Sequence, residues 1–479
     1  MLGSGFFAQD WLRAGLQYGS SALGTMGNYI VQNTIGDSYA AYRNPEEFIS
    51  ELHRRSWESG TNVGIGHIGP YWQSWLPKFV YVSGSDNASF RSIAEYGEHE
   101  LYPDPAARSP FKVVERILGM QVINTMQGKE PMQEKAKLKA HLNSAGSLNE
   151  VYEHSLKILS QLIEEHQQQT EEERESFPVL VNHLIFNILG HCVFGINTEL
   201  DKKYIPEFME MARLITNPWP SQQALQAANL RLRAISEELL QGTSSSIDEN
   251  GYVADHAELS HYPDEEEKME KLSAENIAGS FLASTNLADL MMKTIAAISE
   301  NREIKTKLMT DLLEHWTGDL QSLSAIPYLD LIYLEAQRLF SPSLIARRNS
   351  KAFILNTRNE QGEPQQHLVP AHSYLFAPIR PRHLDPNLWD MPQLFDPERF
   401  AGEEGQKREK LLVTFSDGMR SCPAKFGFTK MLFKTIIAGF FSRVGEIQFE
   451  KPVEITPVFS INTSWQEDNR ADFIMRSSP

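Results

Sequence analysis

One cysteine of this chain stands in a setting that suits chemistry. Cys422 lies in the segment FSDGMRSCPA, and a cysteine reacts or binds a metal only as the thiolate. Gly418 permits a tight turn before it, and a helix beginning near Ala424 would aim its N-terminal N–H groups back at the sulfur. Arg420 is placed to meet a carboxylate beside such a metal. Taken alone, a cysteine in a turn before a helix is a weak indication of a metal site.

The other cysteine has a different setting. Cys192 lies in the apolar run FNILGHCVFG, which predicts a buried and unreactive thiol. With only two cysteines the chain needs no disulfide framework, so a reducing compartment is expected. The 14 histidines are scattered, and His256 and His261 lie in a polar tract. This pattern argues against a zinc hydrolase.

Three further motifs precede Cys422 in the chain. The segment YLEAQRLF contains Glu335 and Arg338, whose spacing puts both on one helix face. RHLDP follows at residues 382–386, and FDPERF supplies Arg399. Surface helices contain many pairs such as Glu335 and Arg338, so the indication comes from the order and spacing of all four segments.

In this order the four segments resemble the cytochrome P-450 family. The haem-binding signature of that family has an aromatic residue, a glycine, a basic residue and the cysteine at fixed spacing. Phe415, Gly418, Arg420 and Cys422 occupy these positions, and Ala424 stands where a glycine is usual. The resemblance covers about residues 40–475. It implies haem b, iron protoporphyrin IX, with Cys422 as the ligand of the iron.

The resemblance also implies a fold. We expect a mainly α protein with a minor β region, the single-domain cytochrome P-450 fold. Residues 1–40 are expected to form an N-terminal segment packed as a helix, and residues 41–479 the haem-thiolate enzyme domain. Glu335, Arg338 and Arg399 are expected to form the buried Glu–Arg–Arg network of the family.

Basic residues for the haem propionates follow from the same resemblance. Arg420 matches one of the family's positions, and Arg348 or its neighbour Arg347 matches another. In GKEPMQEKAKLKAH, Pro131 and Lys135 stand where the family often has an aromatic residue or histidine and an arginine. Lys135 would reach a propionate as a point charge, without the planar fork of arginine. A solvated helix face is an equally good interpretation of Lys135.

The distal helix, SAENIAGSFLASTNLADLMMKTIAAI, departs from the family pattern. Typical oxygen-activating members have a glycine, any residue, an acid and a threonine there. Counting back from ENREI puts Ser284 after the glycine position, Thr285 at the acid and Asn286 at the threonine. An acid–alcohol pair relays protons through water, whereas an asparagine is neither a practical acid nor a practical base. Asp289 is one turn away.

These three residues are the candidate catalytic residues, and they leave the chemistry open. An asparagine at this position is similar to the family branches that include prostacyclin synthase and the sterol hydroxylases. The leading hypothesis is a monooxygenase that inserts oxygen from O2 into an apolar small molecule. The alternatives are a haem isomerase, dehydratase or peroxygenase that acts on a peroxide without a redox partner, and a haem-binding protein without catalysis. Asn286 could also simply pack against a neighbouring carbonyl group.

Charge indicates the class of partner. A net charge of −17 argues against general nucleic-acid binding. Lys425, Lys430 and Lys434 make the cysteine side locally basic, and an acidic ferredoxin or flavodoxin could dock there as electron donor. An ordinary solvated face is the alternative interpretation of these lysines. Trp219, Phe281 and Leu282 are expected near an apolar substrate.

Periodicity predicts the remaining organisation. Residues 105–345 read as mainly helical, with a polar, acidic loop at 242–271. After Arg348 a hairpin is expected with its turn near Gly362, then an extended proline-rich segment at 370–397. A helix follows Cys422, and the last 30 residues alternate like short strands.

The N-terminal region indicates where in the cell the protein is expected. It lacks a cationic start followed by an apolar run, and no stretch reaches the roughly 20 apolar residues of a membrane span. The amphipathic segment from Phe6 to Leu16 is expected to pack on the protein or, at most, to touch a membrane peripherally. We therefore expect a cytoplasmic protein.

Overall fold

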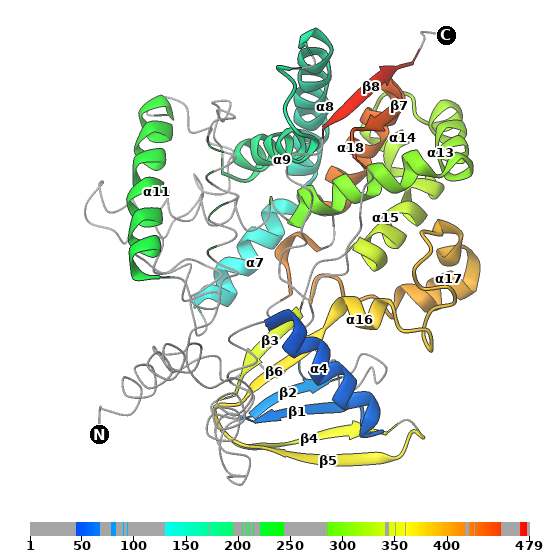
Figure 1. Cartoon of the computed structure of the whole chain (residues 1–479). Coiled ribbons are helices and arrows are strands. Elements are labelled where there is room, and N and C mark those ends of the chain that lie inside the picture. The colour runs from blue at the N-terminus through cyan, green and yellow to red at the C-terminus, as the bar shows by residue number, and fades with distance from the viewer. Residues whose placement is uncertain are drawn as a thin grey trace. The chain divides into compact units, whose positions relative to one another are not determined.

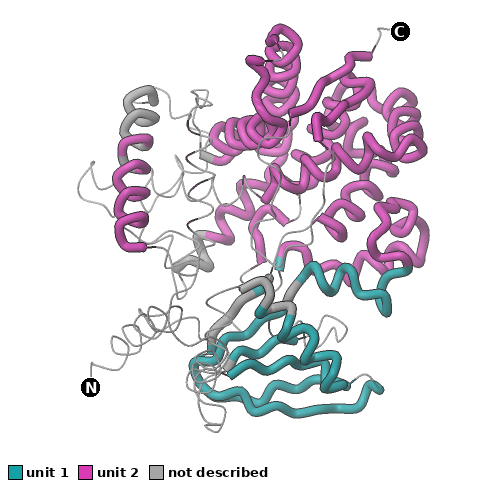
Figure 2. The backbone as a smooth tube through the Cα atoms, viewed as in Figure 1, with its two compact units in different colours: residues 1–108, 343–390, 416–420 teal, residues 109–342, 391–415, 421–479 magenta. Residues whose placement is uncertain are grey.

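The structure is a computed structural model, and it describes part of the chain. The described residues are 45–67, 78–82, 90, 93, 130–170, 172–194, 204, 207, 210, 214, 221–243, 284, 286–340, 344–349, 351–359, 361–416, 421–425, 427–451 and 470–476. The chain divides into two compact units, each built from segments that are distant in sequence (Figure 2). Unit 1 comprises residues 1–108, 343–390 and 416–420, and unit 2 comprises residues 109–342, 391–415 and 421–479.

Unit 1 contains a four-stranded sheet. Its strands are β1 (Val63–His67), β2 (Lys78–Val82), β6 (Tyr374–Pro378) and β3 (Leu344–Arg348), in that spatial order. Helix α4 (Pro45–Glu58) lies against β1 and β2 (Figure 1). β2 runs parallel to β6, whereas its pairing with β1 is antiparallel. The β2–β6 pairing thus joins the start of the chain to a segment almost 300 residues later.

A hairpin and a short helix complete the described part of unit 1. The hairpin pairs β4 (Phe353–Arg358) with β5 (Pro364–Val369), and Gly362 in its turn has a φ of +80°, which favours glycine. This confirms the predicted hairpin. The proline-rich segment was predicted to be extended, but it also contains helix α16 (Ile379–His383). The side chains of Arg382 and His383, within or at the end of this helix, are fully buried.

Unit 2 is mainly helical. Its named helices are α7 (Glu130–Leu142), α8 (Ala145–Gln168), α9 (Phe177–Phe194), α11 (Gln222–Thr243), α13 (Arg302–His315), α14 (Leu320–Ser324), α15 (Pro327–Phe340), α17 (Gly402–Glu409) and α18 (Phe428–Arg443). A further helix runs from 286 to 300. The short helices η4 (Pro397–Phe400) and η6 (Pro423–Lys425) and the strand pair β7 (Val444–Phe449) and β8 (Ala471–Met475) complete its described elements.

The core of unit 2 forms around α18, which is apolar on almost every side. Residues 431–441 of α18 are all buried, and the helix packs on α8 and α15. Gly439 lets α8 approach closely, because a Cβ atom there would lie 2.8 Å from the Leu156 side chain and 2.9 Å from that of Leu159. α8 begins at the N-cap Ser144, whose hydroxyl accepts the N–H of Ser147. α18, the helix that follows Cys422, therefore lies in the middle of the unit.

The structure confirms the predicted fold class. The described residues are mostly helical with small sheets, and the helix after Cys422 and the final strand pair are present. The polar tract 242–271, apart from the last residues of α11, lies outside the described residues. The same holds for residues 1–40, so the predicted domain boundary stays a prediction. Within the described part of the chain, no helix has both the length and the apolar character needed to cross a membrane.

Candidate thiolate metal centre

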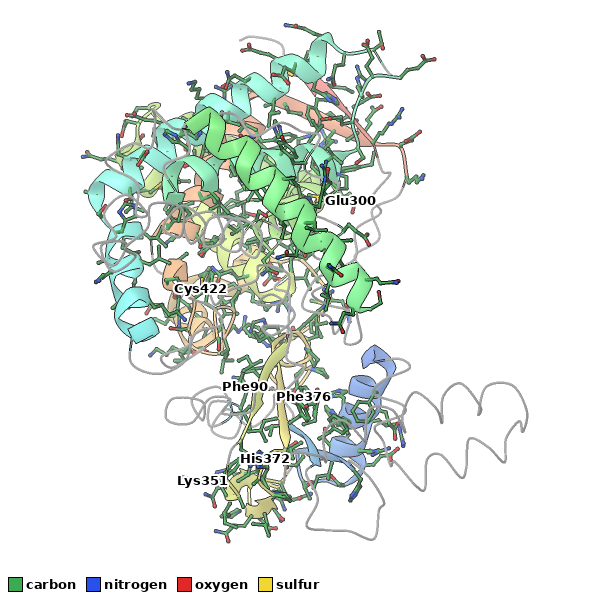
Figure 3. The ribbon with its side chains drawn as sticks, turned by 90° about the vertical axis from the view of Figure 1, so that its left-hand side faces the viewer. Phe90, Glu300, Lys351, His372, Phe376 and Cys422 are labelled. Atoms are coloured by element: carbon green, nitrogen blue, oxygen red, sulfur yellow. The ribbon has the colours of Figure 1, made fainter. Side chains whose placement is uncertain are left out.

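Cys422 lies on the loop that leads into α18 (Figure 3). Its backbone N–H donates to the carbonyl of Phe415 at 2.9 Å, which closes the loop between them. Its own carbonyl accepts the N–H of Lys425 at 3.3 Å and so begins the single turn of η6. Two backbone hydrogen bonds thus hold the cysteine on both sides. Gly418 and Arg420, within the same loop, lie outside the described residues.

Opposing effects act on the thiol of Cys422. The residue is only partly exposed, and desolvation by the protein around the sulfur raises the pKa of the thiol. A hydrogen bond from the backbone N–H of Ala424 and the positive charges of Lys135 and Lys425 lower that pKa. Desolvation is the largest of these effects, so the pKa of the thiol lies above its usual value, and the backbone N–H and the two cations offset part of the cost of a thiolate. The structure thus brings Lys135 to Cys422, although the two residues are far apart in sequence.

Lys135 acts from helix α7, where it is half-buried. α7 packs against η6, so the position of Lys135 depends on the turn that follows the cysteine. Arg347 and Arg348 lie on β3, paired in register with Leu375 and Tyr374 of β6. The side chains of these two arginines lie outside the described residues.

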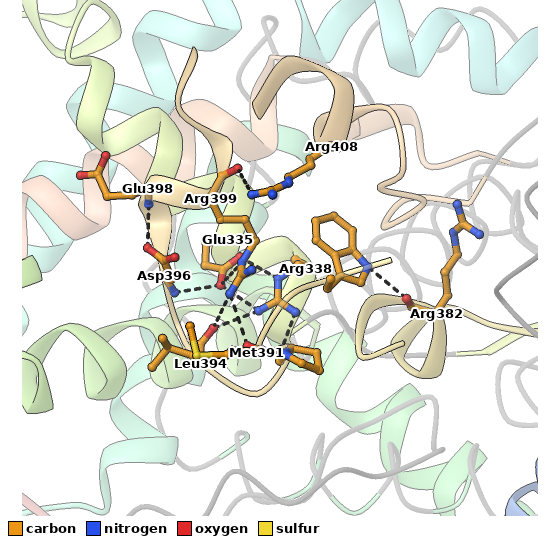
Figure 4. A network of polar contacts seen from close by, with 11 residues as sticks. Glu335, Arg338, Arg382, Met391, Leu394, Asp396, Glu398, Arg399 and Arg408 are labelled. Carbon is orange, nitrogen blue, oxygen red and sulfur yellow. Dashed lines mark hydrogen bonds and ion pairs between the residues drawn. The ribbon is translucent and has the colours of Figure 1, made fainter. Parts of the chain in front are cut away.

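Unit 2 contains a buried network of charges (Figure 4). Arg338 donates to both carboxylate oxygens of Glu335, at 2.7 and 2.8 Å. Arg399 lies 3.3 Å from Glu335 Oε1, and the backbone N–H of Asp396 donates to the same oxygen at 2.9 Å. The side chains of Glu335 and Arg338 are fully buried, and that of Arg399 is nearly so. One carboxylate therefore joins α15 to the segment that contains η4.

The arginines also bind backbone carbonyls of the segment before η4. Arg338 donates to the carbonyls of Pro392 and Leu394, at 2.8 and 3.1 Å. Arg408 of α17 donates to the carbonyl of Arg399 at 3.1 Å. These bonds fix an irregular segment that has few backbone partners of its own. The network therefore holds the segment before η4 against α15.

The motif RHLDP lies in unit 1. Arg382 is fully buried, and its guanidinium group lies 5.4 Å from the ring centroid of Phe90. The carbonyl of Arg382 accepts the indole N–H of Trp389 at 3.1 Å. The described contacts of this motif are therefore structural, and they join residues of unit 1.

Lys434 corrects the predicted basic face. Its side chain is 1 % exposed, and its ammonium group donates to the carbonyl of Ser324 at 2.8 Å and to Asp330 at 2.7 Å. Desolvation lowers the pKa of Lys434, against the effect of Asp330. The prediction that Lys434 belongs to a docking surface is wrong. Lys430, four residues earlier, is 41 % exposed and lies 3.2 Å from the same carboxylate.

The distal helix is described from Asn286 onwards. Ser284 is buried, Asn286 is partly exposed, and Thr285 lies outside the described residues. Asp289 and Lys293, which follow on the same helix, form an ion pair at 2.9 Å. The sequence signal for it was an acid and a lysine four residues apart in an otherwise apolar helix.

Tyr333 is a second residue that sequence reasoning missed. It lies on α15 with its ring centroid 5.1 Å from that of Phe433 in α18, and it is 4 % exposed. Among the described residues its hydroxyl has no hydrogen-bond partner. Burial raises the pKa of this hydroxyl, and the Cys422 thiolate raises it further. A buried polar atom near the cysteine therefore remains available to a group that binds there.

Other expectations have mixed outcomes. Cys192 is buried, and desolvation raises the pKa of its thiol well above the usual value, as expected for an unreactive cysteine. The remaining predicted positions lie outside the described residues: His256, His261, Trp219, Phe281, Leu282 and the segment from Phe6 to Leu16.

Comparison with known proteins shows which family part of the chain resembles. A partly exposed cysteine that receives a backbone N–H, in a helical unit with a buried Glu–Arg–Arg network, is compatible with a cysteine that binds a metal as thiolate. A family model described as cytochrome P450 matches residues 254–442, which include the distal helix, the network and Cys422. Residues 254–442 are therefore similar to the cytochrome P450 superfamily, whose members carry a haem-thiolate cofactor.

Individual relatives come from several kingdoms. A cyclooctat-9-en-7-ol 5-monooxygenase of Streptomyces melanosporofaciens is 25% identical over 256 residues, covering 52% of this chain and 53% of the relative. The probable cytochrome P450 6a13 of Drosophila melanogaster is 27% identical over 267 residues, covering 49% and 52%. Cytochrome P450 705A5 of Arabidopsis thaliana is 28% identical over 212 residues, covering 40% and 39%. The chain spans about half the length of the first of these relatives.

Proposed function

We propose that this protein is a haem-dependent monooxygenase that inserts one oxygen atom of O2 into an apolar small molecule. The observation that carries the proposal is the setting of Cys422, whose sulfur receives the Ala424 N–H and faces Lys135 and Lys425. A thiolate bound to haem iron donates electron density that favours cleavage of the O–O bond. The name of the Streptomyces relative, a 5-monooxygenase, includes the same reaction type.

The residues present fit a haem b group. Cys422 would bind the iron, and Phe415, Gly418 and Ala424 would shape the loop around the thiolate. The buried hydroxyl of Tyr333 has no partner among the described residues and could bond to a group held there. Lys135 and Lys425 would stabilise the negative charge of the Cys422 thiolate. Arg420, Arg347 or Arg348, and Lys135 are the proposed partners of the propionates. When bound, the haem would supply the activation of O2.

The chain's own residues have separate tasks in this proposal. The Ala424 N–H and the two lysines stabilise the negative charge of the thiolate. On the distal helix, Ser284, Thr285 and Asn286 would position water and substrate and handle protons. Lys425 and Lys430 would receive a ferredoxin- or flavodoxin-type electron donor. We also propose a cytoplasmic location and a haem-thiolate domain that spans residues 41–479.

Spectroscopy and turnover test the leading function. The purified protein should show the carbon monoxide difference spectrum of haem-thiolate proteins after reduction. Titration with a panel of apolar compounds, followed at the Soret band, should identify ligands. Turnover of such a ligand should require O2, NADPH and a redox partner. Product formed without O2 and without an electron source would overturn the proposal.

Asn286 supports a second candidate function. It is partly exposed on the distal helix at the position where oxygen-activating relatives have threonine, and an amide can orient a peroxide oxygen. The protein would then be an isomerase, dehydratase or peroxygenase that acts on a peroxide. Assays of wild type, Asn286→Ala and Asn286→Thr with linoleic acid hydroperoxide test it. Equal kinetics of the three proteins would refute a role of Asn286 in such a reaction.

A haem-binding protein without catalysis is the remaining alternative. It predicts binding of carbon monoxide and imidazole to the haem-loaded protein without turnover under any electron supply. The turnover and hydroperoxide assays above therefore also decide this case.

A further inference from the structure

His53 of unit 1 has a hydrogen-bond partner on each ring nitrogen. The indole N–H of Trp57 donates to its Nε2 at 3.1 Å, and the hydroxyl oxygen of Tyr81 lies 2.8 Å from its Nδ1. His53 and Trp57 are four residues apart on α4, so helix geometry places them on one face. Tyr81 comes from β2, against which α4 packs. The histidine therefore connects the last turn of α4 to the sheet.

The partners of His53 determine where its proton lies. An indole nitrogen only donates, so Nε2 of His53 must accept and carries no proton. A neutral imidazole has a single N–H, which is then on Nδ1 and donates to the oxygen of Tyr81. Burial, and after it the charge of Asp385, raises the pKa of the Tyr81 hydroxyl, so the phenol stays protonated and its oxygen can accept. Both contacts together therefore require the neutral ring.

Protonation of His53 would break one of these contacts. The second proton goes to Nε2, and that nitrogen then becomes a donor that faces the indole N–H of Trp57. Desolvation lowers the pKa of His53 below its ordinary value of 6.5, although the charge of Asp385 acts in the opposite direction. The ring is therefore neutral at pH 7 and gains its proton only in more acidic solution.

The charged residues on the same helix are paired with one another. Glu51 lies 2.6 Å from Arg54 and 2.9 Å from Arg55, and Arg54 also pairs with Glu58. These pairs leave a small net field at the ring of His53, because each positive charge lies beside a negative one.

The sheet brings few charges to the ring. His67 and Lys78 form the register pair at the far end of β1 and β2, three residues from the position of Tyr81 and therefore about 10 Å along the strands. Among the described residues, Asp385 is the charge that acts on the pKa of His53. The position of the titration thus depends on burial and on this one carboxylate.

The residues in contact differ in their freedom to move. Tyr81 is 0 % exposed, and it pairs in register with Gly64 of β1. A Cβ atom at Gly64 would overlap the backbone carbonyl of Leu52, so α4 lies directly on β1 next to His53. Trp57, in contrast, is 40 % exposed. Repulsion at Nε2 is therefore relieved by movement of the indole ring, and not of the helix or the sheet.

We propose that His53 is a pH-sensitive switch: its neutral ring holds the indole of Trp57 on the last turn of α4, and its protonation releases the indole to solvent. The proposal is independent of the function proposed above. The backbone of Trp57 also takes part in the turn toward β1, because its carbonyl accepts the N–H of Gly60 at 3.0 Å. In the protonated state we therefore expect this turn to open more often.

Fluorine NMR of the haem-loaded protein tests the switch. The eight tryptophans are replaced by 5-fluorotryptophan, and Trp57→Phe identifies the resonance of Trp57 by its loss. The pH is lowered from about 7.5 to about 5, a range that spans the ordinary pKa of histidine. The resonance of Trp57 should move toward the position of free 5-fluorotryptophan, with a midpoint below pH 6.5.

Two variants assign the titration. His53→Gln keeps an oxygen that can accept the indole N–H and removes the titrating ring, so the resonance of Trp57 should stay at its neutral position. His367→Gln is the matched control and should titrate like wild type. His367 is also a partly buried histidine of unit 1, its Nε2 lies 3.2 Å from the hydroxyl of Thr357, and desolvation lowers its pKa as well.

Hydrogen–deuterium exchange of wild type gives a second measurement, which decides the case if His53→Gln does not fold. After correction for the pH dependence of the intrinsic rate, protection of residues 54–60 should fall about tenfold below the midpoint, as expected for the loss of one hydrogen bond. Protection of residues 428–443, in the core of unit 2, should not change.

The results that contradict the switch are specific. A Trp57 resonance that does not titrate in the folded wild type overturns the proposal. The same holds if it titrates equally in His53→Gln, because another group would then cause the movement. Unchanged protection of residues 54–60 over this pH range also overturns it.

Discussion

Arg338 donates two hydrogen bonds to Glu335, at 2.7 and 2.8 Å, and neither side chain is exposed to solvent. The two residues lie three positions apart on α15, so helix geometry brings them together before any tertiary contact forms. Arg399 and the N–H of Asp396 then bind the same carboxylate from a segment 60 residues later. The local pair on α15 thereby also binds the segment that contains Asp396 and Arg399.

Breaking this network should unfold the protein. Glu335→Gln leaves two buried arginines without their counter-charge, and we expect a loss of about 3–5 kcal/mol in the free energy of unfolding. Urea denaturation followed by circular dichroism measures it. Arg54, which pairs with Glu51 and Glu58 on the surface of α4, provides the control, and Arg54→Gln should leave the midpoint unchanged. Equal stability of Glu335→Gln and wild type would show that the network is dispensable.

Gly427 should tolerate no side chain. Its N–H donates to Asn143 Oδ1 at 2.6 Å, and a Cβ atom would lie 2.7 Å from that oxygen. Gly427→Ala should therefore break the bond that holds the start of α18, at a cost of about 1–3 kcal/mol. Thermal denaturation tests this, with Gly146→Ala as control, because a Cβ atom at Gly146 meets nothing within 4 Å.

A double variant separates this contact from general crowding. Asn143→Ala should cost about as much as Gly427→Ala, and the combination should cost no more than either alone. Additive losses would mean that the glycine and the asparagine act independently, which contradicts the contact.

Sequence reasoning predicted the fold class correctly, and it singled out the cysteine segment, because both signals are local. Helical periodicity, the hairpin turn at Gly362 and the short segment from Phe415 to Ala424 each depend on neighbouring residues. The same reasoning found Glu335, Arg338 and Arg399, but only the resemblance to a family predicted that they meet.

What the sequence could not supply was the direction in which a side chain points. Lys430 and Lys434 lie four residues apart and were assigned to one exposed face. Because α18 is buried on almost every side, Lys434 instead points into the core and binds Asp330. Tyr333 was missed because a tyrosine in an amphipathic helix has no distinguishing pattern. Its relation to Cys422 exists only after α15 and α18 pack together.

The two lysines should therefore respond differently to substitution. Lys425→Gln with Lys430→Gln should slow reduction by a ferredoxin about tenfold at low ionic strength, because the positive surface that steers the donor is lost. Stopped-flow reduction at several salt concentrations measures this. Lys407→Gln, on exposed α17, is the control and should keep the wild-type rate. An unchanged rate in the double variant would remove this surface as a docking site.

Lys434→Met should instead affect stability. It leaves Asp330 and the carbonyl of Ser324 without their buried partner, and we expect a loss of about 3–5 kcal/mol in the free energy of unfolding. Urea denaturation measures it. A variant that is as stable as wild type but is reduced slowly by ferredoxin would restore Lys434 to the docking surface.

His154 should make stability depend on pH. Its ring stacks on that of His191 at 3.9 Å, and His191 lies 3.2 Å from Glu150. Desolvation, followed by the charges of His191 and Lys157, lowers the pKa of His154 from 6.5 to about 4. Between pH 4 and 6.5 the unfolded chain therefore binds a proton at His154 that the folded protein does not bind. Stability from this group is complete above pH 6.5 and is lost as the pH falls toward 4.

Urea denaturation at several pH values between these limits tests this effect. His154→Gln should lose less stability than wild type as the pH falls, because it removes the group that must stay neutral. His315→Gln, on the exposed end of α13, is the control and should follow wild type. If His154→Gln has the same pH dependence as wild type, the stacked pair does not hold His154 neutral.

Replacing the two cysteines should separate ligation from packing. Cys422→Ser keeps the loop, because the backbone bond to Phe415 does not involve the side chain. A serine hydroxyl is a much weaker acid than a thiol and stays protonated, so the iron should lose its thiolate. The carbon monoxide complex of Cys422→Ser should then lack the absorption typical of haem-thiolate proteins. Cys192→Ala, which alters a buried thiol away from the loop, should retain it. A thiolate-type spectrum in Cys422→Ser would show that another residue binds the iron.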